Sequence, residues 1–187
     1  MRLSAKIVLG SGAILIAGII ALSLTEASIA EQLVDTSGID TIKVSGDSTA
    51  LSIRSSQGSH TLKVEKQDKR WCNLDVIVRR EGQQLNLDVQ RRGFASSLFC
   101  DPTVWLDMPE EHNLTVQLDA LAADIAGSFN KVEFSGNKTV LNFNGAAKAF
   151  RLAGDAGVFN VRFSEPIARD AVRIDVPLSV ARVVYAD

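Results

Sequence analysis

Hydrophobic and polar residues alternate with a period of two through most of the chain after residue 38. Successive side chains of a β-strand point to opposite faces, so this alternation predicts strands that are buried on one face. The alternating runs are short and are bounded by Gly, Asn, Asp or Ser; they begin at Ile42, Leu51, Leu62, Val76, Leu85, Val104 and Leu114. No amphipathic helix of three turns occurs after residue 30. We therefore expect a single all-β domain over residues 39–187.

In the second half of the chain, strand centres recur about every nine residues. The runs at 131–136, 140–145 and 149–154 each end in glycine, and a fourth run follows at 158–163. This recurrence suits a β-solenoid or β-roll, in which short strands joined by tight turns stack on one another. It also suits an antiparallel β-sandwich. Small residues at the corners favour the solenoid, and the sandwich stays as the alternative. The predicted inward side chains are Phe134, Phe143, Leu152 and Val161.

Two features break the regular pattern in the middle of the chain. Residues 74–80 and 85–92 flank Glu81 and Gly82, which predicts an antiparallel hairpin inserted or appended at one end of the stack. The next alternating run, residues 104–108, lies between two prolines. Proline cannot donate a ladder hydrogen bond, so this run is typical of an edge strand.

The first thirty residues have the pattern of an export signal. Arg2 and Lys6 precede an uncharged apolar stretch over residues 7–24, and small residues occupy the positions that signal peptidase reads before a cut after Ala30. The stretch is also near the minimum length for a transmembrane helix, so an N-terminal membrane anchor remains the second interpretation. We interpret residues 1–30 as signal peptide or anchor and residues 31–38 as a linker.

Both interpretations place the rest of the chain outside the inner membrane, in the periplasm or at the cell surface. The two cysteines, Cys72 and Cys100, would then lie in a compartment that permits disulfides. They flank the predicted hairpin, so we expect a disulfide that clamps its base.

Charge excludes one class of function and suggests one site. With 20 Lys and Arg against 22 Asp and Glu, the net charge of −2 lacks the basic footprint of a nucleic-acid-binding protein. Positive charge is concentrated at the hairpin, in Arg79, Arg80, Arg91 and Arg92. These arginines form a candidate anion-binding patch. The alternative is a solvated hairpin whose charges discourage strand pairing.

No coherent catalytic set emerges from the sequence. Residues 46–48 (Gly-Asp-Ser) follow an apolar strand and resemble the nucleophile block of GDSL-type hydrolases, but neither His60 nor His112 follows an Asp by three positions as the base of such a hydrolase would. We interpret 46–48 as a turn. Asp119 and Asp124 are the nearest carboxylates in the regular region, and nothing requires them to converge as a general acid and base must. We expect no metal site, no cofactor and no enzymatic activity.

Several strand patterns together carry a resemblance to a known family. The chain has an Ile-Lys-Val-Ser-Gly-Asp run at 42–47, a Val-Trp-Leu-Asp-Met-Pro run at 104–109, and glycine-punctuated strands over 114–163. Over about residues 39–176 it resembles the bacterial exported β-solenoid domains of the auto-transporter adhesin head GIN type. The resemblance implies the fold and export.

We accordingly expect a non-catalytic, adhesin-like module that presents a binding surface at the cell envelope. The alternatives are a carbohydrate-active β-helix enzyme and a structural subunit of an envelope assembly. The expected partner is an envelope polysaccharide, a lipid headgroup or another envelope protein, and not a nucleic acid. Membrane contact is expected only through residues 7–24, if they are retained.

Overall fold

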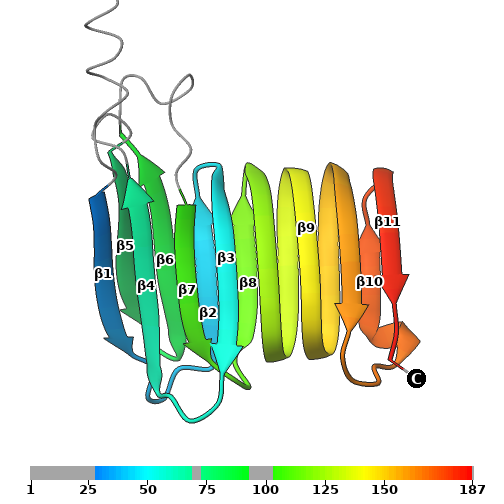
Figure 1. Ribbon diagram of the computed structural model, residues 1–187, viewed down its shortest axis with the longest axis horizontal. Coiled ribbons are helices and arrows are strands. Elements are labelled where there is room, and N and C mark those ends of the chain that lie inside the picture. The colour runs from blue at the N-terminus through cyan, green and yellow to red at the C-terminus, as the bar shows by residue number, and fades with distance from the viewer. Residues whose placement is uncertain (1–27, 69–72, 93–102, 187) are drawn as a thin grey trace, which may run out of the picture.

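The computed structural model describes residues 28–68, 73–92 and 103–186, and within them the protein is all-β (Figure 1). One curled, mixed sheet contains all eleven strands, and the only helical element in these ranges is the 3-10 turn Arg169–Ala171. The strands are β1 (Ser28–Asp35), β2 (Thr41–Gly46), β3 (Thr49–Ser56), β4 (Thr61–Asp68), β5 (Leu74–Glu81), β6 (Gln84–Arg91), β7 (Thr103–Pro109), β8 (Asn113–Leu118), β9 (Ala120–Phe163), β10 (Val172–Asp175) and β11 (Leu178–Val184). The predicted all-β class is confirmed.

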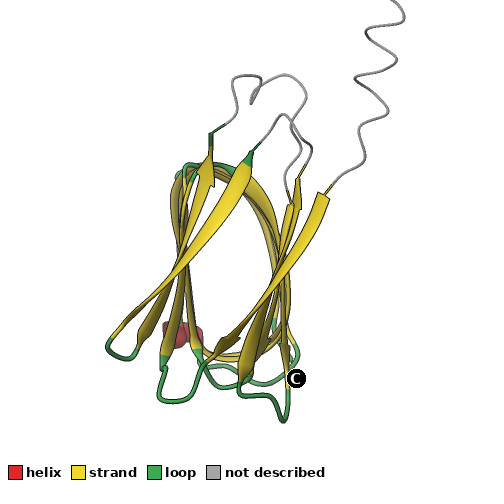
Figure 2. Ribbon diagram, turned by 90° about the vertical axis from the view of Figure 1, so that its left-hand side faces the viewer, coloured by secondary structure: helices red, strands yellow, loops and turns green. Residues whose placement is uncertain are grey.

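The sheet curls into two facing layers that enclose the core (Figure 2). The strand order is β1-β4-β7-β3-β9-β8-β2-β6-β5, with β10 and β11 also pairing with β9. We call β1, β4, β7 and β3 the front layer and β5, β6, β2 and β8 the back layer, as they lie in Figure 1. Residues 121–126 of β9 pair with β3 and residues 131–135 pair with β8, so β9 passes from one layer to the other.

Neighbouring turns of β9 are offset by 18 residues. Leu114 of β8 pairs with Val132 in parallel, and the Asn160 side-chain amide donates a hydrogen bond of 3.1 Å to the Asn142 side-chain oxygen. Lys148 Nζ donates to Asn130 Oδ1 at 2.7 Å, again 18 residues away. The nine-residue recurrence in the sequence is therefore half of one turn. Each half comprises one strand segment and one corner. This parallel pairing differs from the sandwich alternative, whose strands would run antiparallel.

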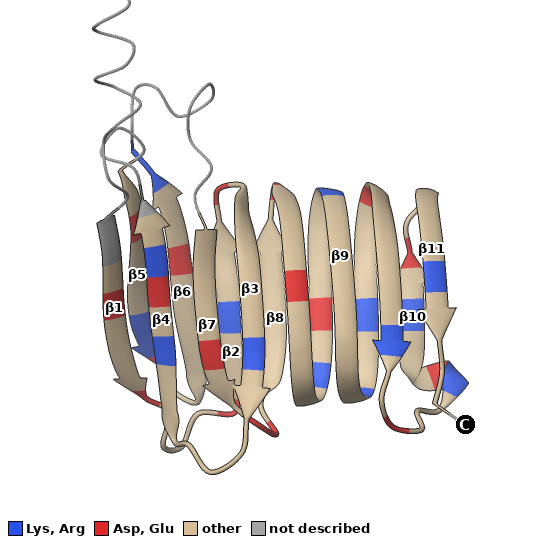
Figure 3. Cartoon of the chain, in the orientation of Figure 1, with Lys and Arg blue, Asp and Glu red and all other residues tan. Residues whose placement is uncertain are grey.

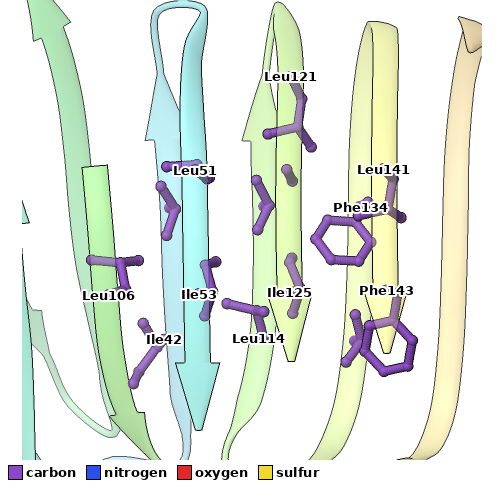
Figure 4. Close-up of a cluster of buried hydrophobic side chains, with 14 of the residues drawn as sticks. Ile42, Leu51, Ile53, Leu106, Leu114, Leu121, Ile125, Phe134, Leu141 and Phe143 are labelled. Carbon is purple, nitrogen blue, oxygen red and sulfur yellow. The ribbon is translucent and has the colours of Figure 1, made fainter. Parts of the chain in front are cut away.

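The core lies between the two layers and is rich in phenylalanine towards the C-terminal end. All four side chains predicted to point inward, Phe134, Phe143, Leu152 and Val161, are buried, which confirms that part of the pattern. Figure 4 shows Phe134 and Phe143 among the aliphatic side chains that the neighbouring strands contribute. Burying alternate residues of most strands removes a large apolar area from water, which is the main force holding the two layers together.

The predicted hairpin is confirmed. Strands β5 and β6 pair antiparallel from Leu74 opposite Arg91 to Glu81 opposite Gln84, with Gly82 in the turn at a positive φ of 61°. Strand β6 joins the sheet by parallel pairing with β2, and β5 lies at the end of the strand order. The hairpin therefore extends the back layer at one end of the stack.

The expectation that residues 104–108 form an edge strand is wrong. They belong to β7, which pairs in parallel with β3 on one side and antiparallel with β4 on the other. Pro109 is the last residue of β7 and lies opposite Ser56, the last residue of β3. At the end of a strand a proline leaves the ladder intact, so the strand can lie inside the sheet.

The N-terminal end of the described chain also differs from the expectation. Residues 28–35 form β1, which pairs antiparallel along the whole of β4 and places Ala30 opposite Lys66, whereas a linker was expected to begin at residue 31. Lys63 of β4 contacts Glu31 at 3.4 Å and Glu65 at 2.5 Å. The hydrogen bond to Glu65 raises the pKa of Lys63.

Residues 1–27 lie outside the described residues, so the signal peptide or anchor and the cut after Ala30 stay predictions. In the part of the chain that is described, no helix has the length and hydrophobicity needed to cross a membrane.

Candidate functional site

The four arginines of the candidate anion-binding patch fall into two separate pairs. Arg79 and Arg80 lie beside the hairpin turn, and Arg91 and Arg92 lie at the opposite end of the hairpin. Arg80 is opposite Leu85, and Arg91 follows Leu85 by six residues along β6. At ~3.3 Å per residue in a strand, the two pairs are roughly 20 Å apart. They do not form one patch.

Two of these arginines already have partners within the protein. Arg80 Nη2 donates a hydrogen bond to the Ser37 carbonyl at 2.8 Å, and Arg92 Nη2 donates to Gln90 Oε1 at 2.7 Å. Both side chains are on the surface, so these bonds do not exclude a ligand. That either pair binds an anion stays a prediction.

Cys72 and Cys100 both lie outside the described residues. The disulfide between them stays a prediction.

The Gly-Asp-Ser segment at 46–48 connects β2 to β3 and has structural partners. Asp47 Oδ2 accepts a hydrogen bond from the Arg91 backbone N–H at 2.7 Å, and Ser48 Oγ accepts one from the Ala120 backbone N–H at 3.1 Å. Each bond ties this connection to a neighbouring turn of the coil. These contacts support the interpretation of 46–48 as a turn.

The histidines and carboxylates that the sequence singled out remain dispersed. His60 lies in the loop between β3 and β4, and His112 lies between β7 and β8. Asp119 is at a corner, and Asp124 points outward from β9. Within residues 28–68, 73–92 and 103–186, no group of three or more His, Cys, Asp or Glu side chains is arranged to hold a metal ion.

A groove of about 490 Å³ crosses the front layer. It lies at the N-terminal ends of β3 and of the front-layer segments of β9, next to the upper corners in Figure 1. Its apolar part is built from outward side chains of adjacent turns. Ala50 pairs with Ala122, and Val140 and Val158 follow at intervals of 18 residues. Val180 of β11 pairs with Val158 and continues the row beyond the residues that line the groove. We call these five residues the apolar column.

The apolar column is unusually exposed. Val140 and Val158 point outward and retain 58% and 54% of their accessible surface, although both side chains are apolar. A continuous row of exposed apolar side chains marks an interaction surface more often than a single exposed residue does. The column is therefore the strongest candidate for a binding site in the described part of the chain.

The charged side chains that line the groove are cationic. Lys138 and Arg91 line it, and no Asp or Glu is among the lining residues. Elsewhere, charges of both signs are spread over the two layers rather than gathered into one patch (Figure 3). An apolar floor with two cations at its rim suits a ligand that is both amphipathic and anionic.

The groove could not be recognised from the sequence pattern, because single valines among alternating strands carry no chemical signature. A comparison of residues at 18-residue intervals would have aligned Ala122, Val140 and Val158. The period was read as nine residues, and at that spacing the column disappears.

Beneath the groove, Thr139 carries a buried hydroxyl without a hydrogen-bond partner among the described residues. Its side chain is 3% exposed. An unsatisfied buried hydroxyl costs roughly 1–3 kcal/mol, so Thr139→Val, which has nearly the same shape, is expected to raise the free energy of unfolding by about 1 kcal/mol. Urea denaturation measures this change. Thr139→Ser keeps the hydroxyl and removes a methyl group, and it should lower stability; a gain with Ser would contradict the explanation.

Comparisons with known proteins support the fold. No family model and no curated protein matches the chain. A crystal structure of a "putative cell adhesion protein" from Clostridium sporogenes has a TM-score of 0.54 at 10% identity, covering 84% of this chain and 99% of that one. At this identity the likeness defines a class by fold alone: all-β proteins built on a curled, mixed sheet.

Other solved structures superpose less well. A "putative adhesin" from Bacteroides fragilis has a TM-score of 0.36 at 9% identity, with 83% of this chain and 96% of that one covered. A "putative lipid binding protein" from Parabacteroides distasonis has a TM-score of 0.27 at 13% identity, with 83% and 78% covered.

Proposed function

We propose that the chain is an exported, non-catalytic β-solenoid module of the adhesin-like head GIN type, which acts at the cell envelope by presenting a binding surface. The parallel offset of 18 residues between turns of β9 supports the solenoid architecture. The structural similarity to the clostridial protein supports the adhesin-like assignment. The export pattern of residues 1–30 supports the location in the periplasm or at the cell surface.

The binding surface in this proposal is the groove, and its ligand is an anionic phospholipid headgroup with the adjoining glycerol and acyl carbons. The observation that carries the proposal is the exposed apolar column lying beside Lys138 and Arg91 with no carboxylate in the groove. The column would cover the acyl carbons, and Lys138, two residues before Val140, would attract the phosphate. Arg91 lies three strands away from Lys138 in the sheet and would add only a longer-range attraction.

Titration of the purified chain with short-chain lipids below their micelle concentration tests this proposal. Dihexanoylphosphatidylglycerol is expected to bind, and dihexanoylphosphatidylcholine, which has no net charge, is expected to bind more weakly. Lys138→Glu replaces an attraction by a repulsion and should weaken binding of the anionic lipid by about tenfold, or ~1.4 kcal/mol. Added salt should also weaken it, because it screens exposed charges.

The matched control is Arg151→Glu, which makes the same change in net charge at an exposed position outside the groove. It should leave binding of the anionic lipid nearly unchanged. Equal affinity for both lipids, or equal loss in the two variants, would contradict a site at the groove.

The alternatives predict other results. Turnover of an anionic or neutral polysaccharide by the purified chain would favour a carbohydrate-active enzyme. Co-purification with another envelope protein at fixed stoichiometry would favour a structural subunit.

A further inference from the structure

The C-terminal end of the sheet has unpaired strand edges. Among the described residues, β10 and β11 each pair only with β9. The opposite edge of each strand therefore carries backbone N–H and C=O groups that are free to pair with another strand. Two large apolar side chains on β11, Leu178 and Val180, are 73% and 71% exposed.

The core is also open at this end. Ala181 pairs with Phe159, so the two side chains point to the same, inward side of the front layer. Phe159 is buried, whereas Ala181 is exposed, since no other strand in the described ranges covers it. On the back layer, Ile174 pairs with the buried Leu152 but is itself only half-buried. Another pair of strands stacked here would complete the burial of these positions.

The other end of the sheet is protected against such pairing. Its edge strands are β1 and β5, and they carry exposed charges at Glu31, Asp35, Arg79, Arg80 and Glu81. Charged side chains on an edge strand discourage pairing with a second sheet. Strand β11 has Arg182 as its only charged residue. The edge of β11 is thus suited to association, whereas β10 carries two exposed charges of opposite sign, Arg173 and Asp175.

We propose that a second copy of this chain stacks on the C-terminal end, so that β11 pairs antiparallel with β11 and β10 with β10 about one two-fold axis. The axis would pass beside Ala181 in the front layer and beside Ile174 in the back layer. This proposal does not depend on lipid binding at the groove.

The registers of the two layers are compatible with a single axis. In the back layer, Ile174 pairs with Leu152, which precedes Gly154 by two residues. In the front layer, Ala181 pairs with Phe159, which follows Gly157 by two residues. Gly154 and Gly157 lie on either side of the same corner, so Ile174 and Ala181 lie at the same height in the two layers. A two-fold axis that is perpendicular to the layers can pass through both positions and pair both strands at once.

The resulting pairs are complementary. In the back layer Ile174 faces itself, and Arg173 faces Asp175 of the second copy. The two-fold axis repeats this contact, so two pairs of opposite charge form on the outer surface. Opposite charges directly across an antiparallel ladder stabilise it. In the front layer the exposed Leu178 faces the half-buried Val184 of the second copy, whereas the exposed Val180 faces Arg182 of the second copy.

Cysteine cross-linking tests the axis. In an antiparallel pair, directly opposed Cα atoms are ~4.5–5.5 Å apart, which is within the range that a disulfide spans. Under mild oxidation, the full chain carrying Ala181→Cys in a mild detergent is expected to form a covalent dimer on a non-reducing gel. Asn142→Cys, which adds an exposed cysteine on an interior turn of β9, should give no more dimer than the unsubstituted chain with its native cysteines. Equal cross-linking of the two variants would overturn the proposal.

A charge exchange tests the register independently, with the molar mass in solution measured by light scattering. Arg173→Asp alone and Asp175→Arg alone each place like charges opposite one another and should weaken dimerisation by about tenfold, or ~1.4 kcal/mol. The double variant restores both ion pairs with reversed sign and should dimerise like the unsubstituted chain. A monomeric unsubstituted chain at all concentrations, or a double variant no better than the single ones, would overturn the proposal.

Discussion

Replacing Phe143 by alanine is expected to lower the free energy of unfolding by about 3–5 kcal/mol. The Phe143 side chain is fully buried. Its ring centroid lies 5.2 Å from that of Phe150, 5.8 Å from Phe163 and 6.2 Å from Phe129, so it joins aromatic residues of both layers. The substitution removes these contacts and leaves a cavity that the surrounding strands cannot close, because each is fixed by its ladder hydrogen bonds. Chemical denaturation followed by circular dichroism measures the loss.

The matched control for Phe143→Ala is Val158→Ala. Val158 is also on β9 but points outward and is exposed. Its replacement should change stability by less than about 1 kcal/mol. If both substitutions destabilised the protein equally, the aromatic cluster would not be the main source of cohesion between the layers.

The strands and their inward faces could be predicted because both depend on local pattern. A residue such as Phe134 or Leu152 is buried because it alternates with polar neighbours on the same strand, and that alternation is visible in a window of six residues. The β5–β6 hairpin was predictable for the same reason, since Glu81 and Gly82 separate two alternating runs that are adjacent in the chain.

Pairing between distant segments could not be predicted from the same information. A nine-residue recurrence is compatible both with antiparallel neighbours and with half-turns of a parallel stack. Parallel contacts over 18 residues, such as the pairing of Leu114 with Val132, distinguish the two arrangements. The edge-strand prediction for β7 failed because a proline at the end of a strand and a proline on an edge look alike in sequence.

The candidate site illustrates the same limit. The arginines at 79–80 and 91–92 appear as one basic cluster in the sequence because the hairpin turn lies between them, yet pairing of the strands sends them to opposite ends. Val140 and Val158 are 18 residues apart in sequence and come together only through the coil. Predicting a site that is assembled across turns requires the length of a full turn, which is 18 residues. The sequence pattern shows a recurrence of nine residues, which is half of that turn.

The corners of the coil should tolerate substitution least, and Gly145→Ala is expected to lower the free energy of unfolding by about 3 kcal/mol. A Cβ atom at Gly145 would lie 2.0 Å from the backbone carbonyl oxygen of Gly127, one turn earlier. The Gly145 carbonyl accepts a hydrogen bond of 2.8 Å from the Ser164 backbone N–H on its other side. Because backbone lies on both sides, no flexible side chain can move to relieve the clash, and the cost should lie at or above the upper end of the ~1–3 kcal/mol typical of overpacking.

Gly58→Ala separates this clash from the general cost of replacing glycine. Gly58 has a positive φ of 79°, so alanine there is strained, but its Cβ would meet no atom within 4 Å. The strain alone should cost about 1 kcal/mol. Thermal and urea denaturation of the two variants should therefore show the larger loss for Gly145→Ala, although its backbone angle is the less demanding of the two. A smaller loss at Gly145 would mean that successive turns can separate at this corner, and the close stacking of the coil would then depend on the layers alone.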